Sequence, residues 1–355
     1  MLKSKFVFKL IVAIVFFTCI VSNGFGQNNL MKFSSLKGNF NFEIVDEVIL
    51  SSEIEFQPVS MNNVDFNSEI IVMSTTRPAT LSIYDRASGK QISVIDKKGN
   101  GPFEFQNITY IKLVDDLIYI NCSTNGLIGI DLTGNGVRQI NYPSQSTSHF
   151  DIDNNHELLV VYNNSSVNKY FVTILNFDAE VINNEIGLGT DNDIWLQAFM
   201  HAGGIVLDSP YIIHAQKDEL KIHLYNFDTG KEISYTYNND RYRKYSLNKS
   251  RDQVQNDPML MINYVMDRSI ISAVYQLSKG YVIELDHRIR DGDNYSELMI
   301  LNSEFEHIDS IILPTDFQKS VGEFSLNNNM DEIVYFNADK ALGEYKVSIF
   351  KLTQN

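Results

Sequence analysis

The chain has 355 residues, of which 44% are hydrophobic, so it is long enough to bury a large core. Its formal net charge is −15, and an acidic surface of this kind disfavours binding to nucleic acid or to anionic lipid. No segment is biased enough in composition to indicate disorder.

The first residues have the pattern of a secretory signal peptide. Several lysines precede an unbroken apolar run at residues 10–21, and small residues follow at Gly24 and Gly26. This order of basic, apolar and small-residue regions is that of a leader removed by signal peptidase. We therefore expect a signal peptide over residues 1–26, with cleavage before Gln27.

The same apolar run has two other interpretations. The first is a membrane anchor, but the run is short for one, so we expect no transmembrane span in the mature chain. Lipidation at Cys19 is the second, although Phe16 stands where a lipobox prefers leucine. Cleavage would leave a net charge of about −18, because the leader carries three lysines and no acidic residue. Cys122 would then be the single cysteine, which excludes an internal disulfide.

From residue 40 onward the chain is a succession of short runs rich in Ile, Val, Tyr and Phe. Runs of this composition, bounded by Asn, Asp, Gly or Ser, predict strands joined by tight turns. One pattern recurs: a hydrophobic strand ends in an Asp or Asn that begins a turn, and a second strand follows. The equivalent positions are Asp85, Asp131, Asn176, Asn226, Asn302 and Lys351, the last in a truncated copy.

The spacing of these positions predicts the fold. Their intervals are 46, 45, 50, 76 and 49 residues, and a four-stranded repeat of about 45–50 residues is the size of a propeller blade. We expect an all-β chain with one six-bladed β-propeller of four-stranded antiparallel blades over residues 27–355. The predicted blades cover residues 57–96, 107–142, 146–188, 201–237, 268–314 and 320–355. A pair of β-sandwiches is the alternative, which the regular spacing disfavours.

The predicted sixth blade is one strand short, and residues 40–50 form a strand without a blade. A ring of sheets must close or leave unpaired edges that invite aggregation. We therefore expect the N-terminal strand to complete the last blade, with residues 42–50 paired to residues 345–352.

The long interval contains an insertion at about residues 238–268. It carries a cluster of five basic residues beside Tyr242 and Tyr245, and Asp257 with Pro258 has the pattern of a helix start. The basic residues are Arg241, Arg243, Lys244, Lys249 and Arg251. A solvated loop with ordinary charges is one interpretation, and an anion-binding or partner-binding loop over one face is the other.

The stretch "KKGNGPFEFQNI" at residues 97–108 raises the question of nucleotide binding. A dinucleotide loop needs a third glycine, which Glu104 replaces, and a helix to follow, but the next residues predict a strand. We interpret Gly99, Gly101, Pro102 and Glu104 as a structural corner between two blades, with Glu104 bonded to nearby backbone.

Catalytic motifs are not evident in the sequence. The seven histidines are scattered, no compact zinc or calcium ligand set occurs, and no serine-hydrolase elbow is found. We therefore assign no catalytic residue, no metal ligand and no cofactor. Ligand contacts are expected where segments enter the innermost strands. The candidates are Tyr110, His149, His201, Arg268 and Glu323, with Asn107 considered beside them.

The segment at residues 81–120 resembles the secreted six-bladed β-propeller proteins of Gram-negative bacteria, including the TolB-like six-bladed group. Members have a turn ending in Gly-Lys, a strand, and a loop reading roughly G-x-G-P-G-E-[YF]. The matching residues are Gly89, Lys90, Gly99, Gly101, Pro102, Glu104 and Phe105. Phe103 departs from the usual glycine, which puts the backbone geometry of the loop in doubt. The resemblance implies an exported binding or scaffold module.

We therefore expect an exported, non-catalytic propeller that binds a protein, peptide or glycan at one face, as a monomer in the periplasm or on the outer cell surface. A propeller hydrolase or lyase with an axial divalent metal is the alternative. A subunit of an envelope complex is a third interpretation, and the sequence does not name the ligand.

Overall fold

The structure is a computed structural model, and it describes residues 34–50, 61–76, 79–122, 126–142, 147–163, 170–188, 203–216, 219–244, 253, 256–257, 259–260, 268–289, 294–313, 324–327, 331–339 and 344–355. All of these residues belong to the second of the chain's two units, Phe33–Asn355. The predicted signal peptide lies outside them. Among the described residues, no helix has both the length and the apolar character needed to cross a membrane.

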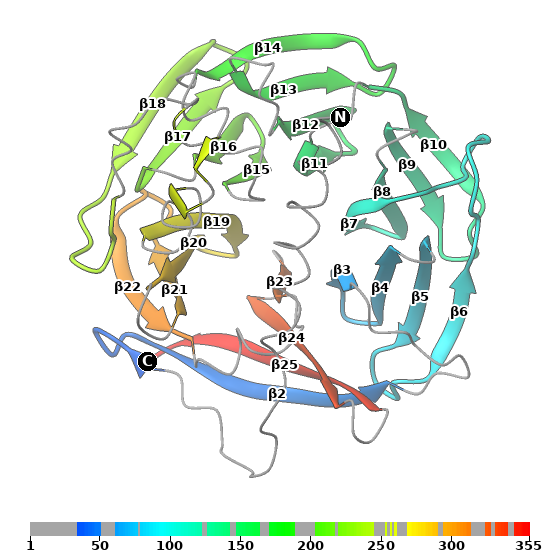
Figure 1. Ribbon diagram of the computed structural model, residues 1–355, viewed down its shortest axis with the longest axis horizontal. Helices are drawn as coiled ribbons and strands as arrows, with labels where there is room; N and C mark the ends of the chain where they lie inside the picture. Colours follow the sequence, from blue (N-terminus) through cyan, green and yellow to red (C-terminus); the bar gives the residue numbers. More distant parts are fainter. Residues whose placement is uncertain are drawn as a thin grey trace. The chain divides into compact units, whose positions relative to one another are not determined.

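The described strands form six antiparallel sheets arranged as the blades of a ring (Figure 1). Blade 1 contains β3 (Met61–Phe66), β4 (Ile70–Thr76), β5 (Ala79–Asp85) and β6 (Gln91–Ile95). Blade 2 contains β7 (Ile108–Val114), β8 (Leu117–Cys122), β9 (Gly126–Asp131) and β10 (Gly136–Ile140). Blade 3 contains β11 (Thr147–Asp153), β12 (Leu158–Asn163), β13 (Tyr170–Asn176) and β14 (Val181–Leu188).

The second half of the ring repeats this order. Blade 4 contains β15 (Gly204–Asp208), β16 (Tyr211–Ala215), β17 (Lys221–Asn226) and β18 (Lys231–Thr236). Blade 5 contains β19 (Arg268–Leu277), β20 (Gly280–Arg288), β21 (Tyr295–Leu301), β22 (His307–Ile312) and the short β1 (Ser34–Ser35). Blade 6 contains β23 (Phe324–Asn327), β24 (Glu332–Asp339), β25 (Glu344–Gln354) and β2 (Phe40–Leu50). The predicted six-bladed propeller is confirmed.

The recurring Asp or Asn stands at the turn between the third and fourth strands of blades 1 to 5. The Asp131 carboxylate accepts hydrogen bonds from the amides of Thr133 and Asn135, at 2.9 and 2.8 Å. The Asn302 side chain accepts the equivalent bonds from Glu304 and Glu306, at 3.1 and 2.8 Å. These bonds stabilise the turn because a short side-chain oxygen replaces a backbone acceptor. The periodic signal in the sequence is therefore a repeated turn.

The ring closes between the two ends of the described chain. β2 pairs with β25 in antiparallel register, from Phe40 opposite Gln354 to Leu50 opposite Tyr345. Phe42, Val48 and Leu50 of β2 are buried in the core, and a register shift between Ile44 and Asp46 interrupts the alternation. The expected pairing of residues 42–50 with residues 345–352 is confirmed, and it runs from Phe42 opposite Leu352 to Leu50 opposite Tyr345.

One feature of the closure was not expected from the sequence. β1 adds a fifth strand to blade 5 before the chain continues into blade 6, so the N-terminal segment joins two neighbouring blades. The buried Asp309 carboxylate holds this crossing, which we call the clasp (residues 34–40). It accepts hydrogen bonds from the Ser35 hydroxyl at 2.6 Å and from the amides of Lys37, Asn39 and Phe40 at 2.9, 3.0 and 3.2 Å.

The hydrophobic core lies between neighbouring blades. Each core cluster joins side chains from two adjacent sheets, such as blades 1 and 2, or blades 4 and 5. Polar contacts add to this packing near the innermost strands. Buried Asp151 on β11 forms an ion pair with Lys112 on β7 and accepts a hydrogen bond from the amide of Leu207 on β15 at 2.9 Å. One carboxylate thus links blades 2, 3 and 4.

Candidate functional site

The structure brings together two of the predicted ligand-contact residues. Tyr110 on β7 and His149 on β11 lie on the innermost strands of neighbouring blades, with ring centroids 5.3 Å apart. Tyr110 also meets the ring of Phe150 edge-on at 5.3 Å. Both predicted residues are half-buried, so each presents part of a ring near the beginning of an inner strand.

The other predicted ligand residues are placed differently. Arg268 is the first residue of β19 and its exposed fraction is 1%. A ligand would reach its guanidinium only after rearrangement of the groups that cover it. His201 and Glu323 lie outside the described residues.

The corner at residues 97–105 is organised around Glu104. Its carboxylate accepts a hydrogen bond from the amide of Gly101 at 2.7 Å. A Cβ atom on Gly99 would lie 1.8 Å from the Glu104 Oε2 atom, so the carboxylate occupies the space that a side chain would need. Phe103 has a φ of 58°, in the left-handed region that glycine favours. Its ring packs on Gly136 of blade 2, which has no side chain to obstruct it.

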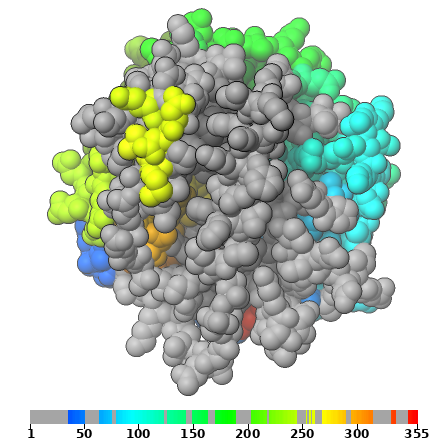
Figure 2. Space-filling model, in the orientation of Figure 1, coloured from blue at the N-terminus to red at the C-terminus, as the bar shows by residue number. Residues whose placement is uncertain are grey.

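The insertion begins and ends at one point on the ring. The amide of Ser269 donates to the carbonyl of Arg243 at 2.9 Å, and the amide of Arg243 donates to the Ser269 hydroxyl at 2.9 Å. Arg243 and Ser269 are therefore neighbours in space, and we call the stretch of sequence between them, residues 244–268, the excursion. Within it, the Asp257 carboxylate accepts a bond from the amide of Met259 at 2.9 Å, which fits the predicted helix cap. The described residues at 253–260 appear in yellow on the face shown in Figure 2.

A buried carboxylate anchors the residues that lead into the excursion. Glu297 on β21 is fully buried and receives two bonds from the Arg241 guanidinium, at 2.8 and 2.7 Å, and one from the Asn239 amide group at 2.9 Å. Burial alone opposes ionisation, but hydrogen bonds from Arg241, His287 and Ser310, together with the Arg241 charge, hold the pKa of Glu297 well below its usual range. Arg241 therefore has a structural role. Of the basic residues predicted in the insertion, it is not available to contact a ligand.

Glu297 is also the last of three hydrogen-bonded side chains, Ser269, His287 and Glu297, which are the residue types of a hydrolase triad. The Ser269 hydroxyl lies 2.7 Å from His287 Nδ1, and His287 Nε2 lies 3.2 Å from Glu297. Ser269 and His287 are each 2% exposed. The serine hydroxyl also accepts a hydrogen bond from the Arg243 amide, and its burial leaves it without access to substrate. This chain supports the fold of blade 5.

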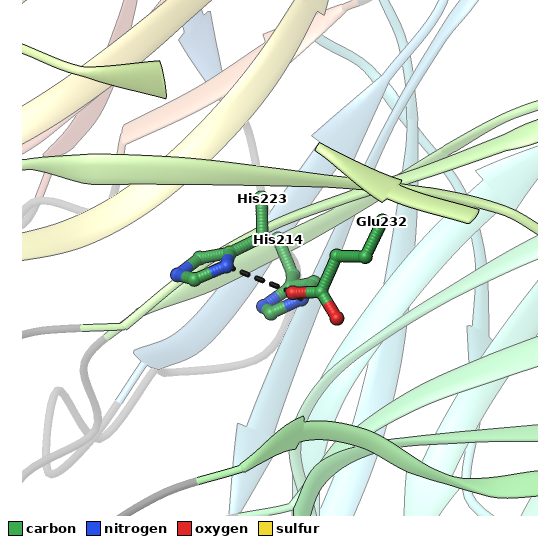
Figure 3. A group of neighbouring side chains, drawn as sticks. All are labelled: His214, His223 and Glu232. Atoms are coloured by element: carbon green, nitrogen blue, oxygen red, sulfur yellow. Dashed lines mark hydrogen bonds and ion pairs between the residues drawn. The ribbon is translucent and has the colours of Figure 1, made fainter. Parts of the chain in front are cut away.

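A second polar group was not anticipated from the sequence. His214 on β16, His223 on β17 and Glu232 on β18 come from the three outer strands of blade 4 and point toward one another (Figure 3). His214 and His223 are directly opposite in the β16–β17 ladder, and their rings stack with centroids 4.8 Å apart. His223 Nδ1 lies 2.9 Å from Glu232 Oε1, and His214 Nε2 lies 4.0 Å from the same oxygen.

Exposure falls from one member of this group to the next. The side-chain exposed fractions are 40% for Glu232, 12% for His223 and 0% for His214. Burial lowers the pKa of His214 to about 3, so its imidazole is neutral. Neither ring nitrogen of His214 has a hydrogen-bond partner. Gly187 of blade 3 permits this burial, because a Cβ there would lie 2.8 Å from His214 Cε1.

The sequence contains a signal from which the pairing of the two histidines can be predicted. A hairpin turn centred between residues 218 and 219 places positions 214 and 223 opposite each other. The histidines are scattered along the chain, and only the residue-level register of this hairpin shows that two of them meet. Glu232 would follow only from the next hairpin, where it lies opposite Tyr225 and diagonal to His223.

Comparison with protein families gives one match. Residues 50–187 match DUF5128, a family described as a six-bladed β-propeller. The comparison with curated proteins found no match.

Two solved structures from Bacteroides are similar over most of the chain. A member of the DUF4221 family from Bacteroides vulgatus has a TM-score of 0.65 at 10% identity, and the match covers 90% of this chain and 99% of that one. A protein of Bacteroides fragilis described as exported has a TM-score of 0.58 at 11% identity, covering 91% and 97%. At these identities the likeness shows the fold alone. The chain is therefore a six-bladed β-propeller similar to bacterial propeller families.

Proposed function

We propose that the protein is an exported, non-catalytic binding propeller that recognises a protein, peptide or glycan at the face carrying the insertion. The observation that carries this proposal is the anchored excursion. Its ends are hydrogen-bonded to each other at Arg243 and Ser269, and buried Glu297 fixes the residues that lead into it to blade 5. A segment held so firmly at its base can present a surface without disturbing the ring.

The chemistry of the described residues favours binding over catalysis. Their Ser–His–Glu chain is buried and its hydroxyl is occupied. The His214 group draws on the second, third and fourth strands of its blade and none of its members is on an innermost strand, so it does not supply the axial metal that a propeller hydrolase or lyase would need.

The hydrogen-bonded ends suggest the experiment. Residues 245–267 are replaced by a short Gly-Ser linker, which the contact between Arg243 and Ser269 allows without strain. The intact protein and the shortened variant are then compared on glycan and peptide arrays. We expect the intact protein to bind a defined class of ligand and the shortened variant to lose that signal while its melting temperature stays close to that of the parent. Equal binding by both proteins would contradict the proposed face.

Two observations support the proposed export of the protein. The leader-like residues 1–26 have the pattern of a signal peptide, and one of the similar structures is a protein described as exported. Expression of the full chain in a Gram-negative host should yield a periplasmic or surface-associated protein whose first residue is Gln27. N-terminal sequencing checks this, and a product that retains residue 1 would refute the cleavage.

A further inference from the structure

We propose that His214, His223 and Glu232 form a binding site for one transition-metal ion of the Zn²⁺ class on blade 4. Two imidazoles and one carboxylate are a ligand set that zinc uses when one coordination position stays open for water or a ligand. Such a set also suits Co²⁺ and Ni²⁺, whereas Ca²⁺ and Mg²⁺ prefer oxygen ligands alone.

The donor atoms already lie close together. The Nε2 or Nδ1 atoms of the histidines and one Glu232 oxygen are within 4.8 Å of one another. A tetrahedral ion with bonds of about 2.0–2.1 Å holds its donors roughly 3.4 Å apart. Glu232 Oε1 already lies 2.9 and 4.0 Å from the histidine nitrogens, so the widest separation is between the two imidazoles, and it must shrink by about 1.4 Å through rotation of the half-buried His223 ring.

The state of His214 is the second, independent observation. A buried histidine normally satisfies its ring nitrogens, because an unpaired polar atom away from water is costly. Both ring nitrogens of His214 are buried without a partner, and Nε2 faces Glu232. A metal ion would take the lone pair of Nε2 and so satisfy one of the two atoms.

The backbone holds the two histidines in place. Both side chains extend from paired positions of adjacent strands in the β16–β17 ladder, so the separation of their Cα atoms is set by the sheet. The Ser234 hydroxyl lies 3.1 Å from His223 Nδ1, and an ion bound at that nitrogen would displace it. Two charged side chains lie near the group: positively charged Lys221 disfavours the binding of a cation, and negatively charged Glu219 favours it.

Metal binding to the purified protein is measured by equilibrium dialysis with Zn²⁺. We expect one ion per chain, and Co²⁺ should give the visible spectrum of a tetrahedral site with nitrogen ligands. X-ray absorption at the zinc edge should show two imidazoles in the coordination shell.

Variants separate this site from incidental binding. His223→Ala and Glu232→Gln should each weaken zinc binding by roughly tenfold or more, since each removes a direct ligand where loss of a supporting group alone costs about 10–100-fold. The matched control is His156→Ala, which removes an exposed histidine that lies 2.6 Å from the Asp153 carboxylate on another blade. It should leave zinc binding unchanged.

Two results would overturn the proposal: no stoichiometric zinc binding by the intact protein, or binding that survives in both site variants. Glu232→Gln is isosteric and exposed, so its fold is expected to persist, and circular dichroism without metal confirms this for each variant. The outcome is independent of the array experiment, since the residues of this site lie outside the excised segment.

Discussion

At the scale of single residues, small and charged side chains determine how the blade corners are built. Glu104 fills the space above Gly99 and accepts the Gly101 amide, so the glycine and the carboxylate are mutually dependent. The sequence could predict that this stretch is a corner, because Pro102 and the lack of a following helix exclude a phosphate loop. It could not predict that Phe103 keeps a left-handed backbone, since that depends on its packing against Gly136 on another strand.

This dependence predicts a coupling between two substitutions. Gly99→Ala should destabilise the protein by about 1–3 kcal/mol, the usual cost of overpacking, because the new methyl group displaces the Glu104 carboxylate. In a Glu104→Ala background the same change should cost much less. Urea unfolding of the four proteins of the cycle measures the coupling. Additive effects would show that the two side chains do not compete for the same space.

Glu297 predicts how stability depends on pH. Its folded pKa is held below the unfolded value, so its contribution to stability is fully present above an unfolded pKa of about 4.3. That contribution is lost as the pH falls toward the folded pKa. Unfolding free energies measured between neutral and acidic pH should therefore fall below about pH 4 in the parent protein.

The variant Glu297→Gln tests the assignment of this pH dependence. It should lower stability at neutral pH by roughly 2–4 kcal/mol, because it removes the charge partner of Arg241 from a buried site. It should also flatten the acid dependence. Glu185→Gln, at an exposed position of β14, is the control and should change neither quantity. An unchanged pH profile in Glu297→Gln would assign the acid lability to other carboxylates.

At the scale of elements, the repeated turn made the blades predictable. Asp131, Asn302 and their equivalents act through their own neighbours in sequence, and local chemistry of this kind is visible in the sequence. The clasp is different. Asp309 and Ser35 are 274 residues apart, and nothing in either segment indicates that they meet.

The clasp carries its own prediction. Asp309→Asn replaces a carboxylate oxygen by an NH₂ group, which cannot accept the bonds from Ser35 and the backbone amides. Stability should fall by about 1–3 kcal/mol, because hydrogen bonds to the charged Asp309 carboxylate are lost, and the amides of Lys37 and Asn39 should exchange hydrogen faster. Asp178→Asn, on an exposed turn, is the control. Unchanged exchange at residues 37 and 39 would mean that Asp309 does not hold the segment.

At the scale of the whole ring, the closing strand was predictable and the His214 group was not. A count of strands left the last blade incomplete and one N-terminal strand unassigned, so the pairing followed from the need to close. The site on blade 4 depends on residue-level register in two successive hairpins and on the glycine of a neighbouring blade. Neither the register nor the position of that glycine can be predicted by counting strands.

Ring closure predicts a large effect of removing β2. Deletion of residues 40–50 exposes the partners of Phe42, Val48 and Leu50, and burial of three such side chains contributes roughly 5–9 kcal/mol. Since a domain's whole stability is about 5–15 kcal/mol, the melting temperature should fall sharply. The control replaces Ile44, Val45 and Ile49, which are 46%, 45% and 55% exposed, by threonine. Little change on deletion would refute the role of β2 in closing the ring.

The direction of the closing pair also sets how the ring responds to mechanical force. Phe40 lies opposite Gln354, and Asn355 donates hydrogen bonds to the carbonyls of Asn39 and Gly38, so the outer ends of both strands meet at one point. A force that pulls these ends apart loads the ladder one rung at a time, and each rung contributes only about 1 kcal/mol. A chain stretched between its two ends would therefore first release the clasp from blade 5 and then unzip β2 from β25, before the hairpin-connected blades bear the full load.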